Sequence, residues 1–347
     1  MGRAGLLTRF SLRLNNDLPV AAFAELAAAA DEAGFDQVWV SHDLFWRSAP
    51  VLVAAAAAAT SRVRLGIGIM NPVSAHPAEL AMHAATLQEV SGGRFLLGLG
   101  AGAAEFLGWA GLDRPRPLAA SREAVLACRA LLRRSSPAEL AEPGDVTVAG
   151  ERAPGWRPQA RLRFDGPPVP VYLGAMGRRM LALGGEIADG VLGLSFPPER
   201  AAASAAIVRD AARAAGRDPA DVDVPACFWC SVDADPERAA APLAEKLAYY
   251  GHSISAQQLA DAGLTPAGFL PAARALERGD IPAARRLITP EMLRLGICGD
   301  AAAVIARARG LTAAGATHLS FGPPLGPDPV AAVGRLGRDV LPALRGS

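Results

Sequence analysis

The 347-residue chain has few of the features that mark disulfide-rich, secreted or membrane proteins. Its four cysteines are too few for a disulfide framework in a chain of this length. The longest apolar run, residues 50–59, is much shorter than the roughly twenty residues that a membrane-spanning helix needs. The amino-terminal MGRAGLLTRF has no signal-peptide hydrophobic core. We therefore expect a cytoplasmic protein with no membrane partner.

An excess of charge of one sign is also missing. Lys and Arg total 35 against 34 Asp and Glu, a formal charge of +1, and no basic run stands out. This balance argues against nucleic acid or an anionic membrane as a partner. The single evident lysine, Lys246, lies on an expected helix, whereas a sugar-phosphate barrel enzyme should carry lysine or paired carboxylates at its strand ends. That enzyme class is disfavoured.

Common catalytic and metal-binding motifs are absent as well. Cys227 and Cys230 form a C-x-x-C, but the surrounding VDVPACFWCSVDAD reads as a buried strand and no second pair completes a metal site. His76 and His83 do not match H-E-x-x-H and are interpreted as structural. We therefore expect no metal site. No ordered Ser-His-Asp or Cys-His set appears, so difficult chemistry would belong to a cofactor.

The most informative segment is residues 62–102, RVRLGIGIMNPVSAHPAELAMHAATLQEVSGGRFLLGLGAG. Two apolar strands joined by a helix indicate a parallel βαβ unit. Both strands end in small residues, where a ligand could approach the backbone closely, although glycine-rich strand ends also mark simple turns. The candidate ligand-binding positions here are Gly68, Ile69, Met70, Asn71, Gly100 and Gly102.

Strand and helix patterns alternate along the whole chain. Eight strands, each followed by a helix, predict one α/β domain over residues 1–347, a (β/α)8 TIM barrel. Two Pro- and Gly-rich insertions are expected, about 135–168 after the fourth helix and 253–290 after the seventh. A doubly wound open sheet is the alternative, but the first βα turn lacks G-x-G-x-x-G and no Walker sequence occurs. Beyond the segment 62–102, the expected strands are 8–14, 37–41, 169–173, 190–196, 222–232 and 317–321.

Candidate acid–base residues follow the second and fourth strands. The loop 41–47 contains His42 and Asp43 with two aromatic residues, which together offer a proton donor, an orienting carboxylate and a stacking wall. The structural alternative is a helix cap by Asp43 with packed aromatics. Glu105, just beyond the fourth strand, is either an acid–base group or a helix cap.

A phosphate site is predicted after the fifth and sixth strands. Gly174, Ala175, Met176 and Gly177 lead directly into a helix that carries two arginines in its first turn. A helix amino terminus offers free N–H groups and a positive dipole to a phosphate. The neighbouring strand end, Gly193, Leu194 and Ser195, adds further N–H groups and a hydroxyl. These features suggest one long ligand, with a planar ring over the glycines and a phosphate tail across the barrel mouth.

Four segments of the chain together resemble the bacterial-luciferase-like superfamily: GFDQVWVSHD, PVYLGAMGRRMLALGGEIADGVLGLSF, SFGPPLGPD and residues 62–102. Within it they are similar to the coenzyme F420-dependent oxidoreductases typified by methylenetetrahydromethanopterin reductase. The resemblance implies a barrel whose third strand ends in a non-prolyl cis peptide, Gly68–Ile69, that supports a deazaflavin ring. It also implies that the segments 175–177 and 193–195 hold the phosphate, and that Asp43 contacts the ring edge.

The function implied is hydride transfer between C5 of F420 and a small organic substrate. The alternatives are an FMN-dependent luciferase-like monooxygenase and a non-catalytic cofactor-binding barrel. Relatives commonly form dimers, and we expect a homodimer through the Ala-rich second and third helices. The chain departs from relatives at His42-Asp43, where many have Asp-His, at Ala103, where one branch has Glu, and at Arg13-Leu14-Asn15, which lacks a carboxylate found in some members.

Overall fold

The computed structural model describes residues 9–140, 147–148, 151–152 and 155–345, and its centre is a nine-stranded parallel sheet. Long apolar runs form these strands because both faces of the sheet are covered. The strand order is β10-β9-β11-β1-β2-β3-β4-β7-β8. The strands are β1 (Arg9–Leu14), β2 (Gln37–Val40), β3 (Arg64–Met70), β4 (Phe95–Leu99), β7 (Val171–Gly174), β8 (Gly190–Leu192), β9 (Ala226–Val232), β10 (Ile297–Gly299) and β11 (His318–Leu325).

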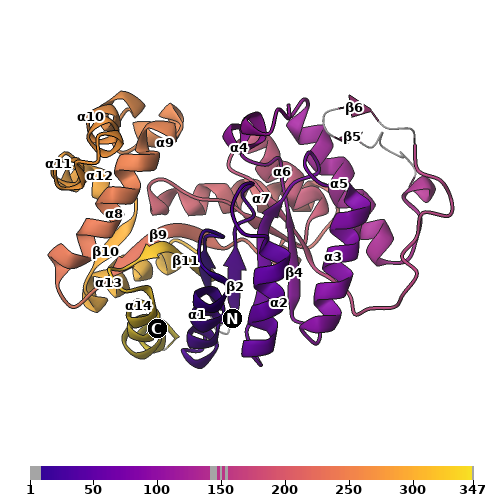
Figure 1. Cartoon of the computed structure of the whole chain (residues 1–347), viewed down its shortest axis with the longest axis horizontal. Helices are drawn as coiled ribbons and strands as arrows, with labels where there is room; N and C mark the ends of the chain where they lie inside the picture. Colours follow the sequence, from indigo (N-terminus) through magenta and orange to yellow (C-terminus); the bar gives the residue numbers. More distant parts are fainter. Residues whose placement is uncertain (1–8, 141–146, 149–150, 153–154, 346–347) are drawn as a thin grey trace.

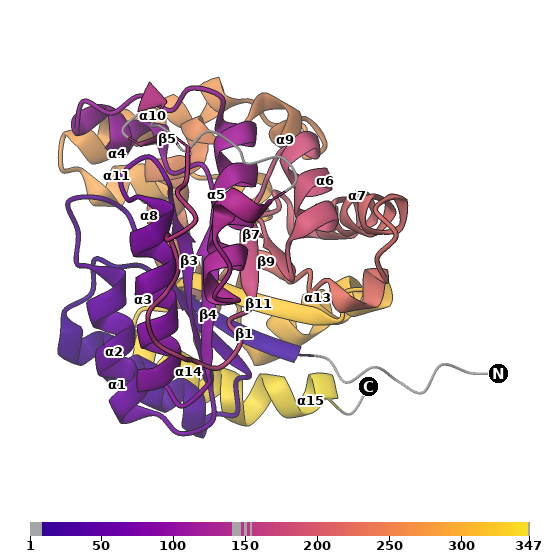
Figure 2. The ribbon, with the colours of Figure 1, turned by 90° about the vertical axis from the view of Figure 1, so that its right-hand side faces the viewer.

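Helices pack around the outside of the curled sheet (Figures 1 and 2). The main hydrophobic core lies between the strands and these helices and includes Leu65 of β3, Leu97 of β4 and Leu80 of α3. The helices that follow strands are α1 (Val20–Glu32), α2 (Ala49–Ala59), α3 (Pro77–Val90), α5 (Pro117–Leu132), α6 (Arg178–Ile187), α7 (Ala201–Ala214), α8 (Pro236–Tyr250), α13 (Ala301–Ala313), α14 (Pro329–Arg335) and α15 (Leu341–Arg345). None of the described helices is long and apolar enough to cross a bilayer.

The two ends of the sheet approach each other. Single parallel bridges join Gly190 to Asp223 and Leu194 to Cys227, so β8 comes beside β9. A second apolar layer fills the interior of the curl, where Trp39 contacts Tyr172 with ring centroids 4.9 Å apart. The interior of the curled sheet is therefore packed with side chains.

The amino ends of the strands hold a buried polar cluster. Both carboxylate oxygens of Asp223 lie 3.0 Å from His318 Nδ1, and Asp223 also accepts from Arg9 Nη2 at 2.8 Å and from Tyr172 Oη at 2.9 Å. Burial opposes ionisation, but His318 and Arg9 outweigh it and lower the pKa of Asp223 to about 2. This cluster ties β1, β7 and β11 to the start of β9.

All eight expected strands are present, and the C-x-x-C strand is buried as predicted. The short strand β10 was not expected, because only three residues, ICG, pair with β9. The segment 253–290 contains three helices, α9 (Ala256–Ala260), α10 (Pro266–Glu277) and α11 (Ile281–Arg286), which agrees with the two or three expected; α12 (Pro290–Leu293) follows directly. In Figure 1 these four helices form the upper left lobe.

The segment 135–168 is described only in part. It contains a 3-10 turn at Pro137–Glu139 and a two-stranded antiparallel ribbon of β5 (Thr147–Val148) and β6 (Glu151–Arg152). Residues 141–146, 149–150 and 153–154 lie outside the described part, as does residue 8 of the first expected strand.

Candidate functional site

The carboxyl ends of the strands meet at one face of the molecule, beneath the short helix α4 (Ala104–Trp109) and the lobe α9–α12 (Figure 2). The Gly68–Ile69 peptide at the end of β3 is cis, as predicted. The pairing of β3 with β4 shifts register between Ile67 and Met70, so a bulge projects at this point.

The Ile69 side chain lies over the glycines that end β4 and β7. A Cβ added at Gly100 would lie 2.9 Å from Ile69 Cδ1, and one at Gly174 would lie 2.8 Å from Ile69 Cγ2. The small residues at these two positions therefore make room for Ile69, whereas the sequence alone suggested space for a ligand. Their binding role stays a prediction, and Ile69 itself is partly exposed at the site.

The turn after β3 is organised by Asn71. Its Oδ1 accepts from the Val73 and Ser74 amides at 3.1 and 2.9 Å, which forms an Asx turn. Gly102 packs against Asn71 with φ +77°, a conformation that favours glycine, and Met70 is buried. Asn71 and Gly102 therefore fix the turn that follows the bulge.

The predicted phosphate cradle has an uncapped helix terminus at its centre. Gly177 is the N-cap of α6 and provides no side-chain cap, so the first-turn amides lack intrahelical partners. The amides of Ala175 and Ser195 are already used, by Leu192 O at 2.8 Å and Cys227 O at 3.2 Å. The first-turn amides of α6 and the Ser195 hydroxyl are therefore the donors proposed for an anion.

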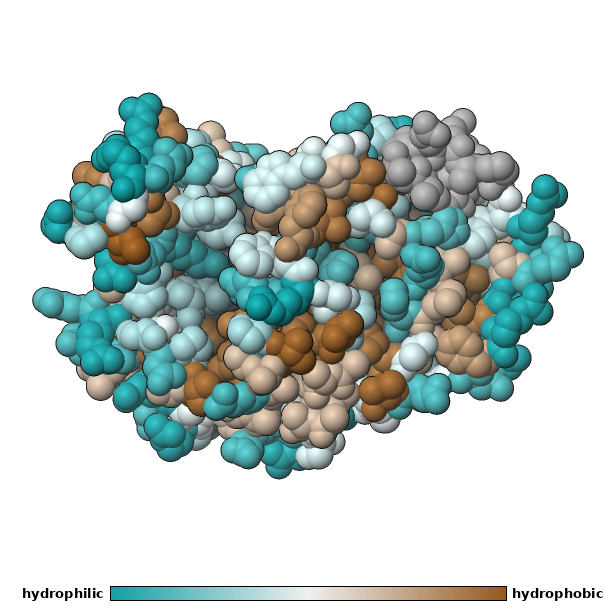
Figure 3. Space-filling view, viewed as in Figure 1, coloured by the Kyte–Doolittle hydropathy of each residue, from teal (hydrophilic) through white to brown (hydrophobic). Residues whose placement is uncertain are grey.

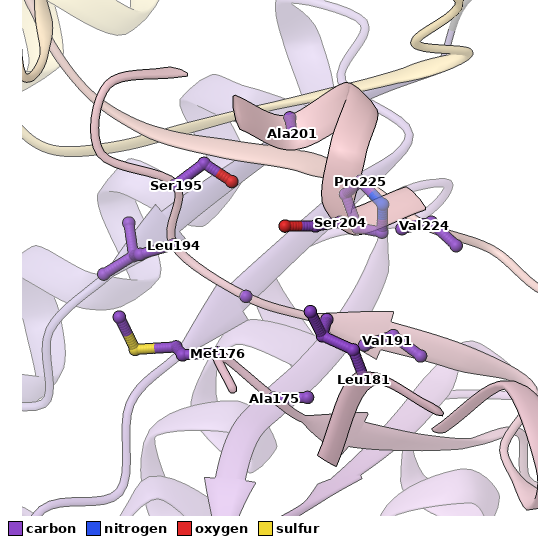
Figure 4. Close-up of a pocket in the computed structure, with 11 residues that line it drawn as sticks. Ala175, Met176, Leu181, Val191, Leu194, Ser195, Ala201, Ser204, Val224 and Pro225 are labelled. Carbon is purple, nitrogen blue, oxygen red and sulfur yellow. The ribbon is translucent and has the colours of Figure 1, made fainter. Parts of the chain in front are cut away.

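Gly193 is required where β8 passes the loop after β7. A Cβ at this position would lie 2.1 Å from Ala175 O. The close approach forms a small pocket in which the hydroxyls of Ser195 and Ser204 point toward each other (Figure 4). Met176 and Leu194 lie at one side of this pocket.

A cavity of about 750 Å³ begins at this pocket and reaches the lobe α9–α12. Met176, Gly177 and Ser195 line one part of it, and Trp229 and Tyr250 line another. In the space-filling view the molecule is hollowed between this lobe and α4 (Figure 3). A volume of this size suits a cofactor-sized ligand.

His42 and Asp43 lie in a loop that the buried Asn16 holds. Asn16 Nδ2 donates to the carbonyls of Asp43 and Arg47 at 2.9 and 2.8 Å, and Ser41 Oγ donates to Asn16 Oδ1 at 2.9 Å. This role of Asn16 was not predicted from the sequence, because an Asn in a polar turn resembles an ordinary helix start.

The three candidate acid–base residues have different surroundings. His42 Nδ1 accepts from the Ala49 amide at 3.3 Å, which requires an unprotonated nitrogen; burial and the charge of His83 lower the pKa of His42. Burial raises the pKa of the half-buried Asp43. Glu105 is exposed in the first turn of α4. Their catalytic roles stay predictions.

Aromatic side chains extend the rim outward. Phe45 and Trp46 are 65% and 55% exposed, so the alternative in which they pack in the core is wrong. The Phe45 ring centroid lies 6.1 Å from that of Trp109, and the Phe106 centroid lies 5.0 Å from the same ring. These rings form an open wall beside the loop 41–47.

Lys246 is a further site residue, which sequence reasoning set aside because it lies on a helix. Its Nζ lies 5.1 Å from the Trp229 ring centroid and 5.0 Å from that of Tyr250, two walls of the cavity. Burial and the neighbouring charge of Arg13 lower the pKa of Lys246 to about 8. Burial, Tyr249 and Asp43 raise the pKa of Tyr250 to about 12. The sequence feature that could have pointed to Lys246 is that the chain contains no other lysine.

The described residues contain no cluster of three or more His, Cys, Asp or Glu side chains arranged to hold a metal ion. Cys227 and Cys230 are free and buried in β9, and His76 caps α3 by accepting from the Ala78 amide at 3.1 Å. His83 is exposed on α3.

Comparisons with known proteins agree with this architecture. The family model described as luciferase-like monooxygenase matches residues 5–318. A 5,10-methylenetetrahydromethanopterin reductase from Methanolobus tindarius is 30% identical over 325 residues, which cover 93% of this chain and 96% of that protein. An F420-dependent glucose-6-phosphate dehydrogenase from Kineococcus radiotolerans is 30% identical over 350 residues, which cover 93% and 92%.

Among solved structures, the coenzyme F420-dependent tetrahydromethanopterin reductase from Methanopyrus kandleri superposes with a TM-score of 0.85. It is 28% identical, and the match covers 96% of this chain and 99% of that one. Sequence and fold therefore agree along nearly the full length. This chain belongs to the luciferase-like monooxygenase family.

Proposed function

We propose that this protein is a coenzyme F420-dependent oxidoreductase that transfers a hydride between the deazaflavin and a small organic substrate. The observation that carries the proposal is the full-length similarity to F420-dependent reductases, at 30% identity in sequence and a TM-score of 0.85 in structure. The parallel strands also end at one face, where α/β enzymes bind their ligands.

The described residues fit such a coenzyme. The uncapped terminus of α6 and the hydroxyls of Ser195 and Ser204 provide donors for a phosphate beside a large cavity. Ile69 projects from the bulge of β3 as an apolar support for a planar ring. When bound, the deazaflavin supplies or accepts the hydride at C5.

The chain's own groups position the substrate and handle protons. The Asn16 network fixes Asp43 and His42 at the rim, and the raised pKa of Asp43 favours its protonated form more than in water. Asp43 is therefore the proposed proton-handling group, while His42 positions the start of α2. Ser253, Ile254 and Ser255, at the start of the lobe, line one side of the cavity, where the lobe would limit the access of water.

We also propose that the curled sheet is a closed (β/α)8 barrel in one domain, with β8 and β9 as the closing pair and with insertions at about 135–168 and 253–290. The bridges from Gly190 to Asp223 and from Leu194 to Cys227 support closure. The four helices α9–α12 between α8 and β10 support the second insertion.

Coenzyme binding tests the proposal directly. Quenching of F420 fluorescence should follow a saturable curve with the purified protein, and Ser195→Ala and Ser204→Ala should each weaken binding by about tenfold, the loss of one hydrogen bond to a charged group. Ser253→Ala, at the other part of the cavity, is the matched control. Tight FMN binding with oxygen consumption, and no F420 binding, would refute the assignment.

We propose a cytoplasmic homodimer that contacts its second copy through α2 and α3. Val51 on α2 and Met82 and Val90 on α3 are more than half exposed, which provides apolar surface for such an interface. Light scattering after gel filtration should give twice the chain mass, and Met82→Glu should lower it. A monomeric native protein would refute this interface.

A further inference from the structure

Two cations, Arg13 of β1 and Lys246 of α8, lie just behind one wall of the cavity. Arg13 contacts Phe228 and Lys246 contacts Trp229, the next residue of β9, which lines the cavity. Lys246 is the only lysine in the chain. Its ammonium lies between Trp229 and Tyr250, at 5.1 and 5.0 Å from their ring centroids, and both rings line the cavity. Aromatic faces attract a cation without neutralising it, so the charge remains available to an anion.

Arg13 reaches this region across the inside of the sheet. It pairs in register with Trp39, and its Nη2 donates to Phe228 O at 2.8 Å. A Cβ at Gly322 would lie 2.3 Å from Nη2, so this glycine leaves the space for the guanidinium. The Arg13 Nε is buried and has no hydrogen-bond partner among the described residues. An unused donor of a buried cation is costly unless a ligand satisfies it.

The nearby carboxylates do not pair directly with these cations. In the described part of the chain, neither Arg13 nor Lys246 has a carboxylate within 4.0 Å. From a longer distance, the charges of Asp17 and Asp43 raise the pKa of Lys246, and those of Glu105 and Tyr249 raise the pKa of Tyr250. Two like charges are therefore held together without a counter-ion in contact, an arrangement that an anion bound between them would stabilise.

The register of Arg13 relates this region to the expected position of the coenzyme ring. Trp39, the register partner of Arg13, lies beneath the β3 bulge, because a Cβ at Gly68 would be 3.2 Å from the Trp39 ring. A group held by Arg13 would then lie on the same face of the sheet as Trp39, two strands from the bulge that carries Ile69.

We propose that Arg13 and Lys246 bind the carboxylate of the substrate, which is therefore an organic acid. The reaction of this acid rests on the proposed function, whereas its binding site rests on Arg13 and Lys246 alone. Arg13 offers its unpartnered Nε as a charged hydrogen-bond donor, and Lys246 offers a point charge. With Asp17 and Asp43 nearby, a monoanion suits the charge balance better than a phosphate dianion.

Because Lys246 is the only lysine, its amine can be observed without assignment. Reductive methylation with ¹³C-formaldehyde labels Lys246 and the amino terminus of the full-length protein, and NMR follows the two signals with pH. Benzoate, crotonate and acetate are added with and without F420, and benzamide, crotonamide and acetamide are the neutral controls. We expect at least one acid, and none of the amides, to shift the Lys246 signal and to raise its pKa above about 8.

Arg13→Met should weaken binding of that acid by tenfold or more. Arg285→Met, which removes a cation already paired with Glu245 on α8 at 3.1 Å, should leave it unchanged. The wild-type titration remains decisive if Arg13→Met does not fold. A Lys246 signal that no acid moves would overturn the inference while F420 binding still supports the proposed function. A shift caused by F420 alone that blocks the acids would assign the site to the coenzyme and also overturn it. Acid binding without F420 binding would keep the site and refute the proposed function.

Discussion

The packing of Ile69 against two glycines leads to a prediction about substitutions at Gly100 and Gly174. A Cβ at Gly100 meets Ile69 Cδ1 at 2.9 Å, and a Cβ at Gly174 meets Ile69 Cγ2 at 2.8 Å. Carbon atoms pack at about 3.5–4.0 Å, so each alanine requires a displacement of at least about 0.6 Å. Neither glycine has a positive φ, and the cost is therefore one of packing alone.

The two alanines should differ in cost because they meet different atoms of Ile69. Cδ1 is the free end of the side chain and moves easily, so Gly100→Ala should cost about 1 kcal/mol in the free energy of unfolding. Cγ2 is attached to Cβ and moves only with χ1 or the backbone, so Gly174→Ala should cost about 2–3 kcal/mol. Urea denaturation of each variant measures these values.

Ile69→Val separates the two contacts. It removes Cδ1 and keeps Cγ2, and it should cost about 0.5–1 kcal/mol because Ile69 is partly exposed. In double-mutant cycles, Ile69→Val should recover most of the loss at Gly100→Ala and none of the loss at Gly174→Ala. Equal rescue at both positions, or no loss at Gly174→Ala, would refute the packing described for Ile69.

Three further substitutions test contacts at the site and at the opposite end of the sheet. Asn16→Ala should cost about 2–3 kcal/mol through the lost hydrogen bonds to the loop 41–47, whereas Asn15→Ala should stay within about 0.5 kcal/mol; equal losses in urea denaturation would contradict the Asn16 network. Gly193→Ala should cost about 3 kcal/mol or more because its Cβ meets Ala175 O, while Gly177→Ala has open space and should cost less than about 1 kcal/mol; thermal unfolding compares them. Asp223→Asn should cost about 3 kcal/mol at pH 7. The lowered pKa of about 2 means that the ionised Asp223 stabilises the fold above pH 4, so this difference should shrink between about pH 4 and pH 2; a constant difference in denaturation across that range would refute the charge-based account.

Local patterns in the sequence predicted most of the secondary structure. Strands such as β3 and β4 form where apolar residues follow one another, and helices begin at polar residues. Both patterns involve only residues that are neighbours in the chain, so the positions of these elements follow from the sequence. The resemblance to a known family located the cis peptide at Gly68–Ile69. The uncapped start of α6 was predictable because it needs only a glycine turn before a helix.

Contacts between distant segments could not be predicted in this way. Only the folded sheet shows that Ile69 fills the space at Gly100 and Gly174, and that Asn16 anchors the loop 41–47. Composition marked Lys246 as unusual, and the family comparison marked Arg13 as a departure. Arg13 contacts Phe228 and Lys246 contacts Trp229 only because curling of the sheet brings β1, β9 and α8 together. Hydrophobic periodicity is a local property and determined the elements, whereas the charge and shape of the site depend on side chains that only tertiary packing brings into contact.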